Sequence, residues 1–261
     1  MLRYVRLWWR FAIMSLVREA EYRVSFAVSV LVGIISLAIA VLTYGVLYGY
    51  TEDVEGWSRA EVLMVLGCFR VAESLIELLV ARNMWNIAEH IREGDMDYVL
   101  VRPVSSQFLA SLRVVNPSEG VNALVGLGLV VYAGNMAGVE WSLERVAAAL
   151  VFGICGLILL YSVWCLAVTF GFWFQSGPLE SVLFWLIDTG RYPVTFFKGW
   201  VRLFLMFIFP VAFASTFPAQ ALRGEINPRL LLAGILMASL SLVGTNRFWN
   251  YGVRHYSSAS S

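Results

Sequence analysis

Three ionisable residues in an otherwise apolar stretch are the first candidates for chemistry. Arg70, Glu73 and Glu77 lie within residues 59–80, at spacings that place all three on one face of an α-helix. Each charge would cost about 2.5–3.5 kcal/mol at the centre of a bilayer on insertion scales. This face must therefore meet protein or water, either as the polar lining of a substrate path or as an Arg–Glu pair that locks helix packing.

A second group of carboxylates occurs in the stretch REGDMD, residues 92–97. Glu93, Asp95 and Asp97 have the composition of a metal site or an acid–base cluster. They lie beside basic residues and apolar anchor residues, however, and that context favours a docking surface for another protein.

Motifs for nucleotide hydrolysis, acyl transfer and metal binding are missing from the sequence. The only lysine, Lys198, is followed by Gly199 and Trp200, so it lies in no phosphate-binding loop. His90 and His255 are far apart and in no ligand spacing, and there is no GxSxG elbow. We expect no catalytic residue, no metal site and no cofactor in this chain. If ATP drives it, ATP and Mg²⁺ bind to a partner subunit.

The composition excludes a water-soluble fold. Of the 261 residues, 59% are hydrophobic and 14% are charged, and the mean hydropathy is +0.73, whereas soluble domains are about 45–50% apolar and about 25% charged. The net charge of +1 gives no footprint for nucleic acid. Cys68, Cys155 and Cys165 lie in apolar runs without a CxxC pair, which excludes a disulfide scaffold. The chain is an integral membrane protein.

Uncharged stretches predict where the chain crosses the membrane, because a helix needs roughly 20 apolar residues to cross about 30 Å of hydrocarbon. Five stretches qualify, and residues 59–80 are added as a sixth despite their charges. We predict an all-α, polytopic membrane protein with one transmembrane domain over residues 24–261. Its helices are expected at about 24–49, 59–80, 118–137, 146–172, 200–222 and 230–246, with residues 81–117 as a cytoplasmic loop and 181–187 as an interfacial stretch.

The basic residues indicate the orientation. With both termini in the cytoplasm, 13 of the 19 basic residues lie on the inner side and four in the outer loops, as the positive-inside rule requires. Without a span at 59–80, the basic loop 81–117 would lie outside. The 13 inner residues are Arg3, Arg6, Arg10, Arg18, Arg23, Arg82, Arg92, Arg102, Arg113, Arg191, Lys198, Arg247 and Arg254.

The first 23 residues have the pattern of a helix that lies in the membrane interface. Arg3, Arg6 and Arg10 fall within an arc of roughly 60° at about 100° per residue, with Trp8 and Trp9 on the opposite side. Such a helix places Trp at headgroup depth and Arg toward phosphate. The alternative is that these residues begin a long first span.

The loop at 81–117 contains an amphipathic helix. Met84, Ile87 and Ile91 recur at helical spacing, and Gly94 signals its end. Apolar anchors, charges and a rigid element make this stretch the predicted docking site for a partner, although a loop lying on headgroups is the alternative. The residues expected to take part are Met84, Trp85, Ile87, Ile91, Arg92, Glu93, Gly94, Asp95, Asp97, Leu100, Arg102 and Pro103.

Part of this loop, IREGDMDYVLVRPVSSQF, resembles the EGxLDxxLxxPxS loop of ATP-binding cassette (ABC) type-2 permeases, with Met96 where that pattern has Leu. The later segments RYPVTFF (191–197), FPVAFASTFPAQAL (209–222) and FWNYGVRHYSSASS (248–261) resemble the six-span bacterial branch of the family. The resemblance implies the permease subunit of an ABC transporter, usually an exporter, in the bacterial cytoplasmic membrane. Its implied partners are a separate ATPase subunit and a second permease, either the same chain or a sister.

The resemblance also implies roles for three segments. Residues 81–104 would press into a groove of the ATPase, and residues 1–23 would form a connecting helix beside them. The segment around 210–222, with Pro210, Phe217 and Pro218, would fold back into the outer leaflet near an extracellular gate. A proline kink in a simple span is the alternative for that segment, since broken backbone at membrane depth needs protein or a cavity beside it.

Two other classes of function compete with the ABC permease. An ion-coupled secondary transporter would use Arg70, Glu73 and Glu77 as its ion site, but the sequence shows no inverted repeat. A membrane enzyme or assembly factor lacks a nucleophile or metal set. The docking loop favours the permease, because an ion-driven carrier needs no cytoplasmic partner.

Overall fold

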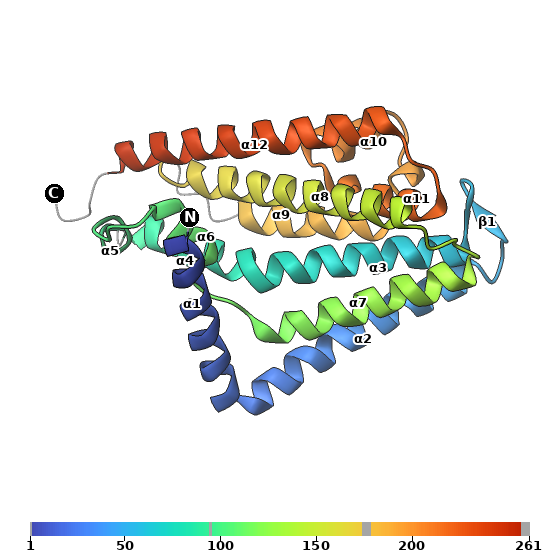
Figure 1. Ribbon diagram of the computed structural model, residues 1–261, viewed down its shortest axis with the longest axis horizontal. Helices are drawn as coiled ribbons and strands as arrows, with labels where there is room; N and C mark the ends of the chain where they lie inside the picture. The colour runs from blue at the N-terminus through green and yellow to red at the C-terminus, as the bar shows by residue number, and fades with distance from the viewer. Residues whose placement is uncertain (1, 94–95, 174–178, 257–261) are drawn as a thin grey trace.

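The computed structural model describes residues 2–93, 96–173 and 179–256, and this part of the chain is helical apart from one small hairpin. The expected all-α class is therefore confirmed. Most helices run along the long axis of the molecule (Figure 1). The hairpin lies at one end, which we call the hairpin end, and α5, the start of α1 and the end of α12 lie toward the other, which we call the termini end. Gly94 and Asp95 of the predicted docking site lie outside the described residues.

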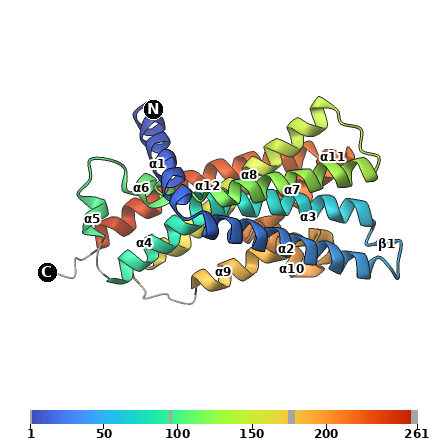
Figure 2. The same cartoon turned by 90° about the horizontal axis from the view of Figure 1, so that it is seen from below.

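The first helix, α1 (Leu2–Glu21), lies across the bundle and is separate from α2 (Arg23–Leu47), which runs toward the hairpin end (Figures 1 and 2). Tyr22 separates the two helices, with φ −107° and ψ 53° outside the helical region. The direction of α1 is that of a helix lying in a membrane interface.

A tight hairpin connects α2 to the next helix. Strand β1 (Asp53–Val54) pairs antiparallel with β2 (Trp57–Ser58). The two turn residues, Glu55 and Gly56, both have positive φ, 50° and 78°, as a type I′ turn requires. Ser58 and Glu61 then form a capping box that starts α3 (Arg59–Ile76).

The chain continues from α3 through a π-helical turn, η1 (Glu77–Ala81), into α4 (Arg82–Glu93). Two short helices follow, α5 (Asp97–Leu100) and α6 (Ser106–Leu112). The segment 81–117, expected as a loop, is thus largely helical, and it forms a layer at the termini end with α1 (Figure 1).

Glycines allow the central helices to approach closely. In the contact between α3 and α7 (Pro117–Met136), a Cβ on Gly67 would come within 2.9 Å of the Val130 nitrogen. In the contact of α8 (Leu143–Phe170) with the backbone between residues 213 and 216, a Cβ on Gly156 would lie 2.4 Å from the Ala214 nitrogen. The last helix, α12 (Pro228–His255), packs along α8. A larger side chain at either glycine would push these elements apart.

After α8 the chain returns to the hairpin end in short pieces. These are α9 (Leu179–Asp188), η2 (Thr189–Arg191) and η3 (Val194–Phe196). The Trp57 indole donates to Thr195 Oγ1 at 2.7 Å, and Lys198 Nζ lies 2.9 Å from a Glu55 oxygen. Arg191 and Lys198 were expected on the same side as the termini, whereas Lys198 lies at the hairpin end.

One span was expected at 200–222, and residues 199–223 are divided into four short helices. They consist of α10 (Gly199–Leu203), the π-helical η4 (Phe204–Ile208), η5 (Val211–Phe213) and α11 (Thr216–Arg223). The two arms, Gly199–Ile208 and Val211–Arg223, are bent by 69°. Because Lys198 and Arg223 both pair with residues of the hairpin end, the chain enters and leaves at that end. A bent pair of this kind is either a broken span or a re-entrant loop, and we call residues 199–223 the re-entrant segment.

Three described helices are long and apolar enough to cross a membrane, namely α2, α8 and α12. Two bent pairs of helices also qualify if each pair is counted as one span, which raises the number to five. The first pair is α6 with α7, and the second is Gly199–Ile208 with Val211–Arg223. Helix α3 fails this test because it carries Arg59, Glu61, Arg70 and Glu73. The total of six spans stays a prediction.

Candidate functional site

The amphipathic helix α4 turns its apolar side inward. Met84, Ile87 and Ile91 are only 0%, 4% and 9% exposed, so they pack within this chain. The expectation that they anchor in a partner needs correction, because their apolar surface is already covered. The outward face carries Trp85, Glu89 and Glu93, all exposed.

The short helix α5 forms the tip of the termini end (Figure 1). Met96 and Val99 are buried beneath it, whereas Tyr98 and Val101 are 75% and 83% exposed. Leu100 and Asp97 are half-buried, and Arg102 and Pro103 are exposed. Exposed aromatic and apolar side chains at a polar end are a surface that a protein partner can cover.

Hydrogen bonds tie α4 rigidly to the start of the next crossing. The buried Asn83 amide donates to the carbonyl oxygens of Leu79 and Val114 at 2.9 and 2.7 Å. Its Oδ1 accepts from the Val114 N–H at 2.7 Å. The Asn116 N–H also donates to the Leu78 carbonyl at 3.0 Å. These bonds connect α4 directly to η1 and to the start of α7.

The transverse helix α1 is attached to the same layer at two points. Near its start, Arg3 donates to the Pro103 carbonyl at 3.2 Å, and the Tyr4 ring packs edge-on against Phe108 with centroids 4.9 Å apart. Further along, the Val115 N–H donates to the buried Ser15 hydroxyl at 3.1 Å. Helices α1, α4 and α6 thus form one connected unit.

A chain of charges crosses the interior between α3 and η2. Arg70 pairs with Glu73 at 2.6 Å, and their side chains are 12% and 14% exposed. Arg191 pairs with Asp188 at 2.9 Å and reaches Glu73 at 4.0 Å. Opposite charges in this network neutralise one another, which reduces the cost of holding them inside the bundle.

Glu77 takes no part in this network. It begins the π-helical η1, and no ion pair among the described residues includes it. The structure therefore pairs Arg70 with Glu73, whereas Glu77 is close enough for their charges to act on it but forms no ion pair with them. Asp188 and Arg191 were not expected as partners, because the sequence reading placed Arg191 in a cytoplasmic loop. No signal in the sequence pairs residues so far apart.

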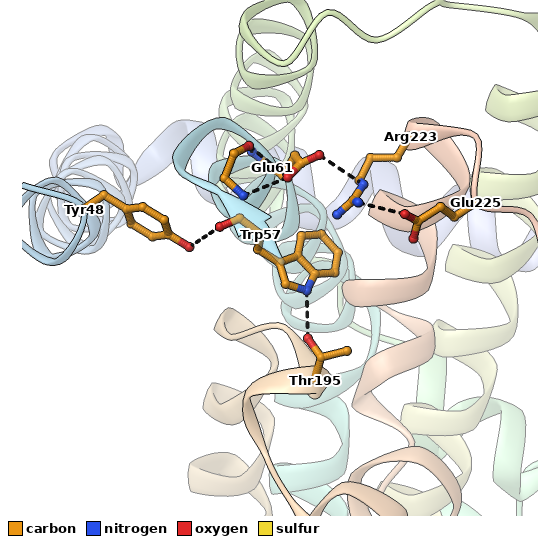
Figure 3. Close-up of polar contacts among 7 residues, drawn as sticks. Tyr48, Trp57, Glu61, Thr195, Arg223 and Glu225 are labelled. Atoms are coloured by element: carbon orange, nitrogen blue, oxygen red, sulfur yellow. Dashed lines mark hydrogen bonds and ion pairs between the residues drawn. The ribbon is translucent and has the colours of Figure 1, made fainter. Parts of the chain in front are cut away.

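The hairpin end is closed by a second polar cluster (Figure 3). Arg223 pairs with Glu61 at 3.1 Å and with Glu225 at 2.7 Å, and its guanidinium lies 4.8 Å from the centroid of the Trp57 ring. Trp57 is 2% exposed and accepts a hydrogen bond from Tyr48 Oη at its carbonyl, 2.9 Å long. Together with the Trp57–Thr195 bond, these contacts join the hairpin and α3 to η3 and to the end of the re-entrant segment.

Sequence reasoning missed this cluster, although one signal for it was present. The spacing Ser58-x-x-Glu61 before an apolar run is the signature of a capping box. It fixes Glu61 at the first turn of α3, where the carboxylate accepts from Ser58 N–H at 2.8 Å through one oxygen and meets Arg223 through the other.

The two prolines of the re-entrant segment have different roles. Pro210 directly follows Phe209, where η4 ends and the chain turns. Pro218 lies in the first turn of α11, a position where proline is tolerated. Phe217, 4% exposed, packs against Phe213 with ring centroids 4.8 Å apart. One proline thus lies at the turn between the two arms, and the other lies in the first turn of α11.

Within the described ranges, no three His, Cys, Asp or Glu side chains come together as a metal site would require. Apolar helices aligned along one axis, with polar layers at both ends, define a multi-pass membrane protein. A family model described as "ABC-2 family transporter protein" matches residues 34–260. The chain therefore belongs to the ABC-2 transporter family, whose members are the membrane permeases of ABC transporters. No curated protein matched it.

Proposed function

We propose that this chain is the permease subunit of an ABC exporter in a bacterial cytoplasmic membrane. It pairs with a second permease, and a separate ATPase subunit that binds ATP and Mg²⁺ drives the pair. Family membership supports the permease assignment. The ion-coupled alternative is not carried further, because Arg70 and Glu73 pair with each other and Arg191 extends the pairing.

In this proposal the termini end faces the cytoplasm. When Arg191 and Lys198 are not counted on the inner side, that side still holds most of the basic residues, which satisfies the positive-inside rule. The crossings become α2, α3, α7, α8, the segment from α9 to η3, and α12, with residues 199–223 as a re-entrant pair at the outer end. The basic residues at the termini end are Arg3, Arg6, Arg10, Arg18, Arg23, Arg82, Arg92, Arg102, Arg113, Arg247 and Arg254.

The ATPase docks on the outward face of α4 and the tip of α5. The single observation that carries this site is the two-sided character of α4: Met84 and Ile87 are buried in the chain, while Trp85, Glu89 and Glu93 are exposed. A rigid helix with an exposed aromatic side chain and carboxylates supplies an anchor and an orientation for a partner. The Asn83–Val114 hydrogen bonds then carry its movement into the bundle.

Charge reversal tests the docking site. In the double variant Glu89→Lys and Glu93→Lys, we expect copurification of the ATPase and transport-linked ATP hydrolysis to fall by about tenfold or more, since like charges across an interface repel. The matched control is Glu52→Lys with Glu144→Lys, two exposed carboxylates at the hairpin end. Wild-type coupling in the first variant, with normal insertion, would contradict the proposed site.

A further inference from the structure

A cavity of about 590 Å³ opens among α1, α4, α5 and α6 at the termini end. Its lining includes Arg18 of α1, Arg102 after α5 and Arg113 after α6, so three separate elements each contribute one guanidinium. None of the described residues that line it is acidic. We call this space the basic cavity.

The three arginines of the basic cavity have no counterion within the described part of the chain. None of the ion pairs found there includes Arg18, Arg102 or Arg113. Partial burial and the neighbouring charge of Arg102 lower the pKa of the Arg113 guanidinium. Positive charges gathered without a carboxylate repel one another, and a bound anion removes that cost.

His90 also contributes to the lining of this cavity. Its Nδ1 is buried with no hydrogen-bond partner among the described residues. The amide side chain of Asn86 also lines the space. Arginine forks bind phosphate oxygens bidentately, and amide and imidazole N–H groups donate to the same oxygens.

Apolar side chains lie beside the basic ones. Phe11 and Met14 of α1 line the cavity, and the same helix exposes Trp9, Ile13 and Val17. A free phosphate ion gains nothing from these apolar contacts, whereas acyl chains do. Because α1 lies across the bundle (Figure 2), the acyl chains of a lipid can lie along this helix while its phosphate group enters the cavity.

We propose that the basic cavity binds the phosphate group of an anionic phospholipid from the inner leaflet. The bound lipid bridges α1 to the layer that contains α4. The inference rests on the proposed function only for the choice of leaflet, because binding is a property of the isolated chain.

Native mass spectrometry of the purified full chain in detergent tests the proposal, with phosphatidylglycerol and phosphatidylcholine as probes. We expect phosphatidylglycerol to bind more tightly than phosphatidylcholine. The triple variant Arg18→Gln, Arg102→Gln and Arg113→Gln should lose about tenfold or more of the affinity for phosphatidylglycerol, since each charged hydrogen bond contributes. The single variant Arg113→Gln should show a smaller loss in the same direction, and it keeps the test available if the triple variant does not fold.

The matched control removes three exposed arginines of α12, which lie outside the cavity, by Arg229→Gln, Arg247→Gln and Arg254→Gln. It should bind phosphatidylglycerol as the wild type does. An equal loss in the control would show diffuse electrostatic attraction and would overturn the site.

Two further outcomes would overturn the lipid as the occupant. The first is that inorganic phosphate raises the thermal stability of the wild type as much as phosphatidylglycerol does and the lipid adds nothing. The second is that the triple variant keeps its lipid affinity but no longer copurifies with the ATPase, which would assign the cavity to an acidic side chain of that partner. Since lipid binding is measured without the ATPase, failure of the docking proposal leaves this test intact.

Discussion

The side-chain amide of Asn83 holds the backbone of Val114 by two hydrogen bonds, each 2.7 Å long. Asn83 lies in the first turn of α4, and Val114 lies just before α7. One buried side chain therefore connects the proposed docking helix to the next crossing. Such a contact has two consequences, one for stability and one for coupling.

Replacement of Asn83 by alanine should lower the free energy of unfolding by about 1–3 kcal/mol, because it leaves the Val114 N–H and carbonyl without these partners. Thermal unfolding of the purified chain measures the change. Arg82→Ala, on an exposed position of the same helix, should have little effect. If Asn83→Ala also leaves ATPase copurification intact but lowers transport, the bond carries movement rather than docking.

Replacement of Glu73 by glutamine should destabilise the chain by roughly 3–5 kcal/mol, since it leaves the charge of Arg70 uncompensated inside the bundle. The double variant with Arg70→Gln should recover part of this loss. Glu140→Gln breaks an ion pair whose glutamate side chain is 82% exposed, and it should cost about 0–1 kcal/mol. Equal losses at Glu73 and Glu140 would show that the interior pair is not desolvated.

Cysteine labelling should show whether residue 198 lies on the outer or on the cytoplasmic side of the membrane. Because Lys198 pairs with Glu55 of the hairpin, Lys198→Cys should react with a membrane-impermeant maleimide from outside intact cells, as Glu52→Cys should. Tyr98→Cys at the opposite end should stay unlabelled. The native cysteines Cys68, Cys155 and Cys165 are buried. Labelling of position 98 together with protection of 198 would reverse the proposed orientation.

Replacement of Arg223 by glutamine should weaken the closure of the hairpin end. The change removes the pair with Glu61 and the cation–π contact with Trp57, which together contribute about 1–3 kcal/mol at a partly buried site. A lower midpoint of thermal unfolding is the expected result. Arg229→Gln, an exposed control on the next helix, should leave the midpoint unchanged. Identical unfolding midpoints in the two variants would show that the contacts of Arg223 do not stabilise the hairpin end.

The sequence by itself determined the class of protein and the presence of its apolar helices. Composition and long uncharged runs are sufficient for this, because the cost of exposing apolar surface to water does not depend on the tertiary arrangement. The loop pattern around residues 92–107 predicted the family, and the match over residues 34–260 confirmed it. The amphipathic pattern of α4 was also readable, since helical spacing is local.

Only the packing of the folded chain decides what the apolar side of α4 contacts. Helical periodicity shows that Met84 and Ile87 share a side, but it does not show whether that side meets a partner or the rest of the chain. Asn83 and Val114 illustrate the same limit, because they are 31 residues apart and pair only once η1 has turned the chain.

The structure differs most from the expectation along the path from α8 to α12, and charge is the reason. A charge in the sequence was taken to mark a water-exposed loop, so Arg191 was placed in the cytoplasm. In the folded chain Arg191 is neutralised by Asp188 and approached by Glu73. Tertiary pairing can hold a charge inside the bundle, and pairing between distant segments is information that no local pattern contains.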